Sequence, residues 1–213
     1  MEANRIARAF AATACVAFTG MAIARAEIIT FNDLNPGSLP GHDEPWEGPI
    51  PNGYDGFTWN NWWVMDTSIA PSDDIGYRNG SVTPPNVAYN GYGTPAFFSS
   101  TPFTLNSAYL TGAWNDGLRV EVQGFVGATL TYDNTYTVNT ESPTLISFDY
   151  VGVDEVNFIT SGGVNVGYGG SGEQVAMDDL NVTFTAVPEV SSTAVLVGLA
   201  ALGMVGFKRM IRA

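Results

Sequence analysis

Hydrophobic and polar residues alternate with a period of two along much of the chain between Glu27 and Ala186. In the clearest run Leu118, Val120 and Val122 alternate with Arg119 and Glu121. Such alternation is typical of half-buried antiparallel strands with one solvent-facing side. Comparable runs occur at residues 28–31, 57–65, 86–89, 108–114, 130–138, 145–150, 156–159 and 180–184.

Glycine, proline and asparagine separate these runs, and we find no amphipathic helix of ten residues between them. About nine short strands with turn residues between them are typical of two antiparallel sheets packed face to face. The sequence therefore predicts an all-β sandwich at residues 27–186, with long loops at 35–53 and 161–172.

The first 26 residues have the three parts of a signal peptide. Arg5 and Arg8 precede an apolar stretch at residues 9–23, and Ala24 and Ala26 frame an A-x-A cleavage site. Cleavage after Ala26 would remove Cys15, the only cysteine. The mature protein would then have neither disulfides nor a catalytic thiol.

The last 27 residues, 187–213, also have three parts. Residues 187–190 form a short motif, and residues 190–207 form an uncharged, mostly apolar run. Eighteen residues span roughly 27 Å as a helix, close to the roughly 30 Å of a hydrocarbon core. The basic end at 208–213 holds Lys208, Arg209 and Arg212. We expect a transmembrane helix with its basic end in the cytoplasm and the acidic domain outside.

This tail resembles the PEP-CTERM sorting domain of exported bacterial proteins. Val187, Pro188 and Glu189 match its motif, and Val190 stands where that family has a second proline. The resemblance implies processing by an exosortase and an association with exopolysaccharide. It also implies a protein that is anchored in the inner membrane before processing and reaches the cell surface or extracellular matrix afterwards.

The middle of the chain resembles exported PEP-CTERM proteins as well. The motifs that carry this resemblance are Gly76-Tyr77, Asn86–Asn90, Gly112–Gly117, Val120–Gly124, Phe148-Asp149 and Met177–Leu180. Domains of that kind resemble jelly-roll sandwiches similar to carbohydrate-binding modules. The resemblance thus implies a jelly-roll-like, two-sheet antiparallel sandwich.

Charge distribution excludes some partners and suggests others. The net charge of −13 argues against binding DNA or RNA, because a surface that repels phosphates cannot release their counterions favourably. Between Glu27 and Val187 there are 19 acidic residues and, as basic residues, only Arg78 and Arg119. These carboxylates either keep the domain soluble or attract cations, Ca²⁺ above all.

Three acidic residues near the domain's ends are candidate calcium ligands. Asp33 follows the first predicted strand, and Asp178 and Asp179 lie in the last. In a jelly-roll the first and last strands commonly run side by side, which would bring these oxygens together. Calcium takes six to eight oxygen ligands, which these carboxylates and nearby carbonyls could supply. We expect a structural calcium ion here, and we expect no required cofactor. The alternative is that one aspartate caps a turn and the other faces water.

Tryptophans next to Asn and Asp are the candidate sugar-binding residues. An indole face stacks on a sugar ring while amides and carboxylates bind its hydroxyls. Trp62 and Trp63 are consecutive on a strand, so only one of them can enter the core. The candidates are Trp59, Trp63, Trp114, Asn115 and Asp116. The alternative is that most of these tryptophans fill the core.

Signals for catalysis are weak. The single histidine, His42, lies in a Gly/Pro-rich loop, and the chain has neither a G-x-S-x-G elbow nor a zinc ligand set. The glycine-rich segment 162–172 lacks the G-K-[ST] of a phosphate loop. We therefore expect a non-catalytic exported surface or matrix protein. The alternatives are a structural or adhesive protein with protein partners, and an extracellular glycan-acting enzyme with a pair of carboxylates.

Overall fold

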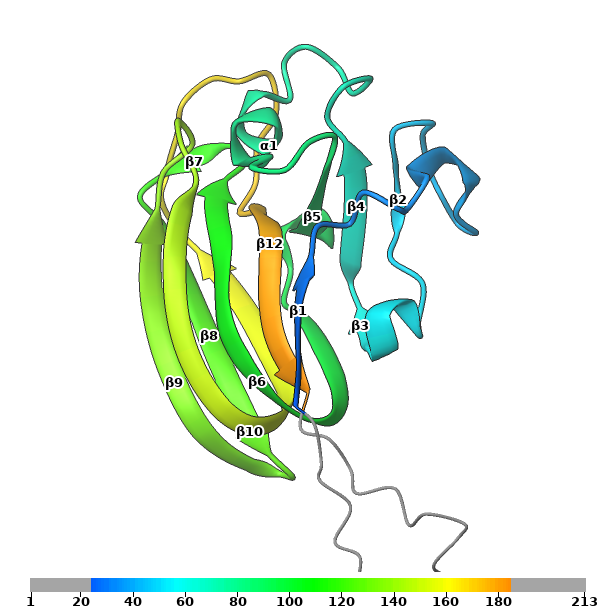
Figure 1. Cartoon of the computed structure of the whole chain (residues 1–213). Helices are drawn as coiled ribbons and strands as arrows, with labels where there is room; N and C mark the ends of the chain where they lie inside the picture. Colours follow the sequence, from blue (N-terminus) through cyan, green and yellow to red (C-terminus); the bar gives the residue numbers. More distant parts are fainter. Residues whose placement is uncertain (1–23, 185–213) are drawn as a thin grey trace, which may run out of the picture. The chain divides into compact units, whose positions relative to one another are not determined.

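The computed structural model describes residues 24–184, which form an antiparallel all-β domain with one short α-helix (Figure 1). The strands are β1 (Arg25–Ile29), β2 (Glu47–Pro49), β3 (Thr58–Asn60), β4 (Trp62–Asp66), β5 (Asn86–Asn90), β6 (Ala96–Gly112), β7 (Asn115–Asp116), β8 (Leu118–Val126), β9 (Thr129–Val138), β10 (Thr144–Ser161), β11 (Val164–Asn165) and β12 (Val175–Phe184). The helical segments are α1 (Ile75–Gly80) and the 3₁₀ turns η1 (Pro36–Ser38), η2 (Tyr54–Gly56) and η3 (Gly91–Gly93).

Ten strands form one hydrogen-bonded sheet, and β7 and β11 form a small second sheet. The large sheet has the order β2-β4-β5-β12-β6-β10-β8-β9, with β1 added to β12 and β3 added to β6. The prediction of an antiparallel all-β domain is confirmed. The structure differs from the prediction of two separate sheets packed face to face, because strand pairing continues from one layer into the other.

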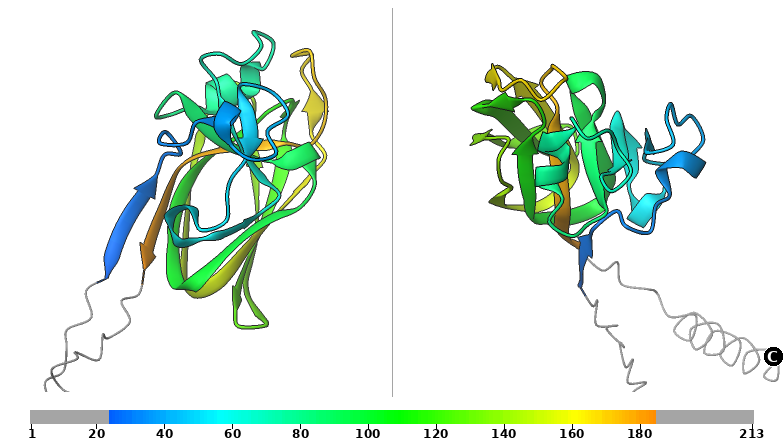
Figure 2. Two further views of the ribbon diagram at one scale, coloured as in Figure 1. Left: turned by 90° about the vertical axis from the view of Figure 1, so that its right-hand side faces the viewer. Right: turned by 90° about the horizontal axis from the view of Figure 1, so that it is seen from above.

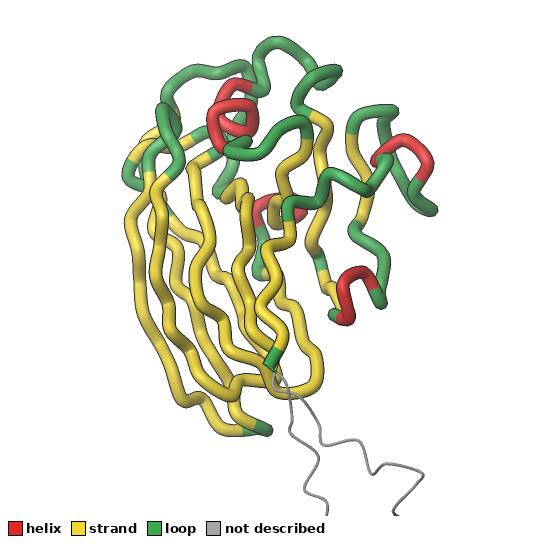
Figure 3. The backbone as a smooth tube through the Cα atoms, viewed as in Figure 1, coloured by secondary structure: helices red, strands yellow, loops and turns green. Residues whose placement is uncertain are grey.

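The long strands β6 and β10 connect the layers. Ala96–Ser99 of β6 pair with β3 and the end of β10, whereas Phe103–Gly112 pair with β12 and the start of β10. The pairing of β6 with β10 shifts register between these parts, near Pro102 and near Gly152, which has φ +72°. Both strands curve round at the lower end of the domain (Figures 1 and 3). The sheet therefore folds over on itself as a sandwich.

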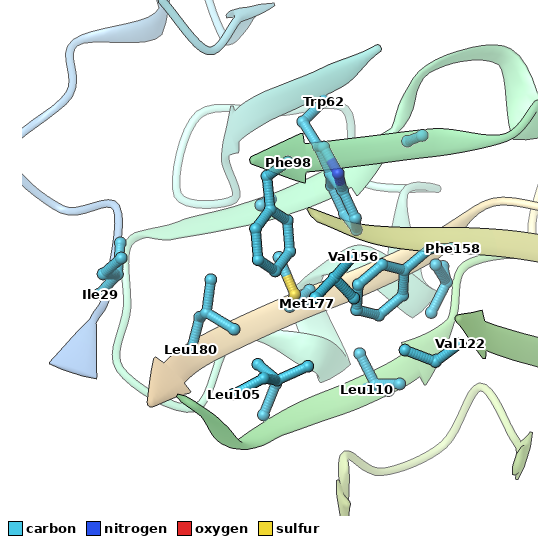
Figure 4. Close-up of a cluster of buried hydrophobic side chains, with 14 of the residues drawn as sticks. Ile29, Trp62, Phe98, Leu105, Leu110, Val122, Val156, Phe158, Met177 and Leu180 are labelled. Carbon is cyan, nitrogen blue, oxygen red and sulfur yellow. The ribbon is translucent and has the colours of Figure 1, made fainter. Parts of the chain in front are cut away.

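The main core fills the space inside this folded sheet (Figure 4). Trp62 of β4 packs edge to face against Phe158 of β10, with ring centroids 5.2 Å apart. Phe98 and Met177 reach the same cluster from β6 and β12. Each large apolar side chain buried here contributes about 1.5–3 kcal/mol relative to exposure. Of the alternating apolar residues at 118–122 and 180–184, all are buried except Phe184, which is partly buried against the core.

A second group of buried side chains, here called the outer cluster, lies on the opposite face of β4, β5 and β12. The alternate residues of those strands supply it, and α1 and the segment before it cover it. Its members are Met65, Ala70, Tyr77, Val87, Tyr89, Ala113, Trp114 and Ala176, with Trp46, Trp63 and Tyr168 packed at its margin. This part of the sheet is therefore covered on both faces.

The first and last strands of the domain are neighbours, as predicted. Arg25–Ile29 pair antiparallel with Leu180–Phe184, so residues 24 and 184 lie at the same end of the domain (Figures 1 and 2). The expected signal cleavage site, Ala24-Arg25-Ala26, overlaps the start of β1. Cleavage after Ala26 would leave Glu27–Ile29 paired with β12.

Most of the signal peptide and the whole tail at 187–213 lie outside the described residues. Among residues 24–184, no helix is long and apolar enough to cross a membrane.

Candidate functional site

A cleft of about 160 Å³ opens on the outer face of β2, β4 and β5, beside the outer cluster. Trp63 and Tyr89 lie directly opposite each other on β4 and β5, and Glu47 of β2 lies diagonally across from Trp63. The remaining lining residues are Asp43, Tyr77, Gly91, Tyr92 and Gln174. Strands thus fix the floor of the cleft, and loop residues form its rim.

Tyr92 projects from η3 at the rim of the cleft, with 73% of its surface exposed. Its ring meets that of Trp63 edge to face, with centroids 6.0 Å apart. Gly91 permits this approach, since a Cβ there would lie 2.7 Å from the Trp63 Nε1. The Asn61 side-chain amide donates to the Gly91 carbonyl and to Thr94 Oγ1, at 3.1 and 2.8 Å, and so holds the turn.

Tyr92 also has φ +56°, a backbone conformation that costs a non-glycine residue roughly 1–2 kcal/mol. Strain of this kind tends to persist at binding and catalytic sites, where the surrounding structure maintains it. The turn therefore holds a large exposed aromatic ring in place at the expense of stability.

Aromatic rings continue from the rim into the outer cluster. Trp63 lies 6.5 Å from Tyr89, Tyr89 lies 5.1 Å from Tyr77, and Tyr77 lies 5.4 Å from Trp114, measured between ring centroids. Their mutual packing fixes the orientation of Trp63. A binding surface built on such rings is formed before any ligand arrives, which reduces the entropy lost on binding.

Two carboxylates flank these rings. The Tyr89 hydroxyl donates to Glu47 Oε2 at 2.5 Å, and the Tyr92 hydroxyl donates to Asp43 Oδ2 at 3.3 Å. Burial and the hydrogen bond to Glu47 raise the pKa of Tyr89. The charge of Asp43 raises the pKa of Tyr92. Both phenols therefore keep their protons, and both carboxylates act as acceptors.

The negative charge extends to α1. Burial, together with the charges of Asp73 and Glu47, raises the pKa of Asp74 to about 6. Burial and the charges of Asp74 and Glu47 also raise the pKa of Tyr77. The cleft can thus offer aromatic faces and hydrogen-bond acceptors to a small polar ligand.

Of the tryptophans predicted to bind sugar, only Trp63 lines this cleft. Trp62 is in the core and Trp63 on the other face, as the alternation requires. The prediction that Trp59 binds sugar is wrong. Trp59 is only 5% exposed, and its Nε1 donates to the Tyr54 carbonyl at 3.0 Å. It packs against Phe57 and Phe98 and has no face to offer a ligand.

The predicted group at 114–116 is structural too. Trp114 is 8% exposed, and Gly170 lies so close to its ring that a Cβ there would be 2.5 Å from the indole. The Asn115 amide donates to the Gly162 carbonyl, and Asp116 Oδ1 accepts from the backbone and hydroxyl of Thr140. These contacts hold loops in place, and the Trp114 ring is almost fully covered.

The candidate calcium ligands do not converge. Asp33 accepts from the Tyr54 hydroxyl, whereas Asp178 accepts from the backbone N–H groups of Val82, Thr83 and Asp179. Asn32, next to Asp33, donates to the carbonyl of Thr83, the residue whose N–H donates to Asp178. Among residues 24–184 no three His, Cys, Asp or Glu side chains are grouped to hold a metal ion.

Asp178 lies at a gap in the pairing along one edge of β12, while on the other edge it pairs with Tyr109 of β6. β12 pairs with β5 through Ala176 and Met177 and with β1 from Leu180 onward, and Asp178 lies between, 0% exposed. Desolvation raises the pKa of its carboxyl to about 7. Next to it, Asp179 Oδ1 is buried with no hydrogen-bond partner in the described part of the chain. The calcium hypothesis now depends on this one oxygen.

Sequence reasoning missed Asp43, Glu47, Tyr89, Tyr92 and Gln174. Tyr89 and Trp63 each occupy an outward position in an alternating run, so the register of β4 with β5 would have paired them. Tyr92 lies between two glycines, Gly91 and Gly93, which is a turn signal that holds an aromatic residue at the surface. The other three come from loops or short strands without a pattern.

Comparison with protein-family models and with curated proteins finds no match. Two solved structures with limited likeness are carbohydrate-binding modules. One is TmCBM61 in complex with β-1,4-galactotriose, with 10% identity, a TM-score of 0.32, and coverage of 63% of this chain and 94% of that one. The other is the family 32 module of NanJ from C. perfringens in complex with galactose, with 17% identity, a TM-score of 0.29, and coverage of 76% and 93%. These scores are too low to support a conclusion about this chain.

Proposed function

We propose that this chain is a non-catalytic exported surface protein whose β domain binds carbohydrate at the cleft that Trp63 and Tyr92 line. The observation that carries the proposal is the strained, exposed Tyr92 ring held against Trp63 beside two carboxylates. Aromatic faces stack on the C–H face of a sugar ring, and carboxylates accept hydrogen bonds from its hydroxyls.

The proposal extends to the sequence-based expectations for the two ends. A signal peptide cleaved after Ala26 would export the chain, and an exosortase would process the tail after it reads Val187, Pro188 and Glu189. The inner membrane would hold the protein before processing, and exopolysaccharide would be its partner afterwards. The basic end with Lys208, Arg209 and Arg212 would stay in the cytoplasm and leave the β domain outside the membrane.

A polysaccharide pull-down with the purified full chain tests the binding. We expect wild type to bind at least one neutral or amino polysaccharide. Tyr92→Ala and Trp63→Ala should lose that binding. Leu145→Ala, which removes a different exposed apolar side chain from β10, should retain it. Unchanged binding by Tyr92→Ala would refute the proposed site. New reducing ends in the incubated polysaccharide would favour a glycan-acting enzyme instead.

A further inference from the structure

The cleft carries an excess of negative charge. Asp43 and Glu47 are acidic, and none of the other lining residues is basic. The two carboxylates approach the aromatic rings from β2 and from the loop before it. A ligand in the cleft is therefore within reach of two negative charges.

The arginines of residues 24–184 do not neutralise this charge. Arg78 donates to the backbone carbonyls of Thr67, Ala70 and Pro71, at 3.2–3.3 Å. Arg25 pairs with Glu27 on β1, and Arg119 lies on β8 in the other layer. The one histidine, His42, precedes Asp43 in the chain but does not line the cleft.

The hydrogen-bonding capacity of the cleft also favours a cationic ligand. The hydroxyl groups of Tyr89 and Tyr92 already donate to Glu47 and Asp43, so each carboxylate keeps spare lone pairs while each phenol has used its proton. A ligand therefore meets more acceptors than donors. A cationic group satisfies such a site best, because its hydrogen bonds to carboxylates are charge-assisted.

The aromatic rings and the size of the cleft limit further which cationic ligand can bind. A cation over the face of Trp or Tyr gains roughly 0.5–2 kcal/mol from the ring quadrupole. Pockets that enclose drug-sized ligands measure about 300–1,000 Å³, so 160 Å³ suits a single sugar ring and not a longer segment. A uronic acid residue would be repelled by both carboxylates.

We propose that the cleft selects a hexosamine residue with a free, protonated amine over its N-acetylated, neutral and uronic counterparts. This inference rests on the proposed carbohydrate function and assigns its ligand class. The sugar ring stacks on the exposed face of Tyr92 beside Trp63, and the ammonium group binds Glu47 and Asp43. Lysine-rich peptides carry the same cation, but they lack a sugar ring whose C–H face can stack on an aromatic side chain.

Binding of matched trisaccharides to the purified full chain tests this inference by calorimetry at about pH 6. The probes are the glucosamine trimer, the N-acetylglucosamine trimer, a glucose trimer, a galacturonic acid trimer and trilysine. We expect the glucosamine trimer to bind at least about tenfold more tightly than the others, as one charge-assisted hydrogen bond allows. Added NaCl should reduce this advantage.

Variants separate the two proposals. Glu47→Gln keeps an acceptor for Tyr89 and should remove most of the preference for the free amine. Asp133→Asn, which removes one charge from β9 in the other layer, should leave the preference unchanged. Equal or tighter binding of the N-acetylated trimer, lost in Trp63→Ala, would overturn the amine preference but preserve the carbohydrate site. Trilysine binding as tight as the glucosamine trimer would also overturn the inference. If no saccharide binds, both proposals fail.

Discussion

Trp63 and Tyr92 meet edge to face at 6.0 Å, although Tyr92 must adopt a left-handed backbone conformation to make the contact. Trp63 comes from a strand whose register is fixed on both sides, whereas Tyr92 comes from a three-residue turn. In this pair the Trp63 ring is held on a rigid strand, whereas the Tyr92 ring is held on a strained backbone. Stability and binding should therefore respond differently to substitution at position 92.

Tyr92→Gly should separate the two properties. Glycine adopts φ +56° without the roughly 1–2 kcal/mol penalty, at an entropic cost of about 0.5–1 kcal/mol. The exposed ring contributes little burial, so we expect Tm to stay within about 4 °C of wild type or to rise. Polysaccharide binding should be lost. Thermal unfolding and a pull-down on the same sample measure both properties. A large fall in Tm would contradict this interpretation of the turn.

Asp178 should be one of the residues least tolerant of substitution. Asp178→Ala would leave the partly buried N–H groups of Val82, Thr83 and Asp179 without their acceptor, and each such loss costs up to about 1–3 kcal/mol. Asp178→Asn retains one carbonyl oxygen and should cost less. Urea unfolding would rank the variants. Asp133→Asn on the exposed β9 serves as the control. Equal stability of the two Asp178 variants and Asp133→Asn would show that the hydrogen bonds to Asp178 contribute little.

Asp178 should also make stability depend on pH. Burial raises its folded pKa to about 7, well above the ordinary value of 3.8, so the folded state binds the proton more tightly than the unfolded state. Its protonation therefore stabilises the fold at low pH, and this contribution is lost as pH rises from about 4 to about 7. Asp74, with its pKa raised to about 6, acts in the same direction. Unfolding free energies across this range should fall with pH in wild type and less steeply in Asp178→Asn. A slope that the variant does not change would assign the effect to other groups.

Calcium binding is a separate prediction. An ion bound only by the folded state, at a hundred times its Kd, stabilises by about 2.7 kcal/mol, which corresponds to roughly 5–10 °C in Tm for a chain of this size. We expect Ca²⁺ to raise Tm more than Mg²⁺ does, because Mg²⁺ requires a tighter octahedral site. Asp179→Ala is the test variant, and Asp33→Ala, whose carboxylate accepts from the Tyr54 hydroxyl, is the control. If Ca²⁺ and Mg²⁺ raise Tm equally, and both variants show the same increase as wild type, the ions act only by screening charge and no calcium site exists.

The tail prediction depends on the sequence alone. Replacing Pro188 and Glu189 by alanine should stop processing and leave the longer form in the inner membrane, since the apolar run and basic end remain. Restoring proline at position 190 should improve processing. Membrane fractionation with mass spectrometry reads both results. Identical mass and location of the double variant would show that the motif is not recognised.

The strands were predictable because burial on one face imposes a period of two on the sequence. The bends were not. Residues 145–150 and 156–159 look like separate strands, since Gly152 interrupts the alternation, but β10 continues through all of them. Asp149 and Gly152 have φ +54° and +72°, and the register shifts around them let one strand serve both layers. Local pattern does not record whether a strand ends or bends at such a point.

The site was less predictable than the fold. Alternation correctly separated Trp62 from Trp63, but nothing in the residues around Trp59 and Trp114 shows that other aromatic rings and Gly170 will cover them. The sequence does not assign partners to Asn86 and Asn90 at the ends of their strand. In the structure Asn86 donates to the Phe31 and Leu34 carbonyls, and Asn90 joins Thr94, Thr160 and Val175. Which polar side chains remain available depends on contacts between distant segments.

The pairing of Tyr89 gives the domain a defined mechanical path. Tyr89 pairs with Trp63 on one side and with Ala176 of β12 on the other. Tension applied to a ligand in the cleft and resisted beyond residue 184 would thus cross from β4 to β5 and then run along β12. From Leu180 to Phe184 that strand is held by β1 on one edge, and β6 pairs with its other edge at Val175–Asp178 and again at Asn181–Phe184. Its hydrogen bonds there would be loaded together in shear instead of opening one at a time, so the strand that leads to the tail is also the one best placed to bear the load.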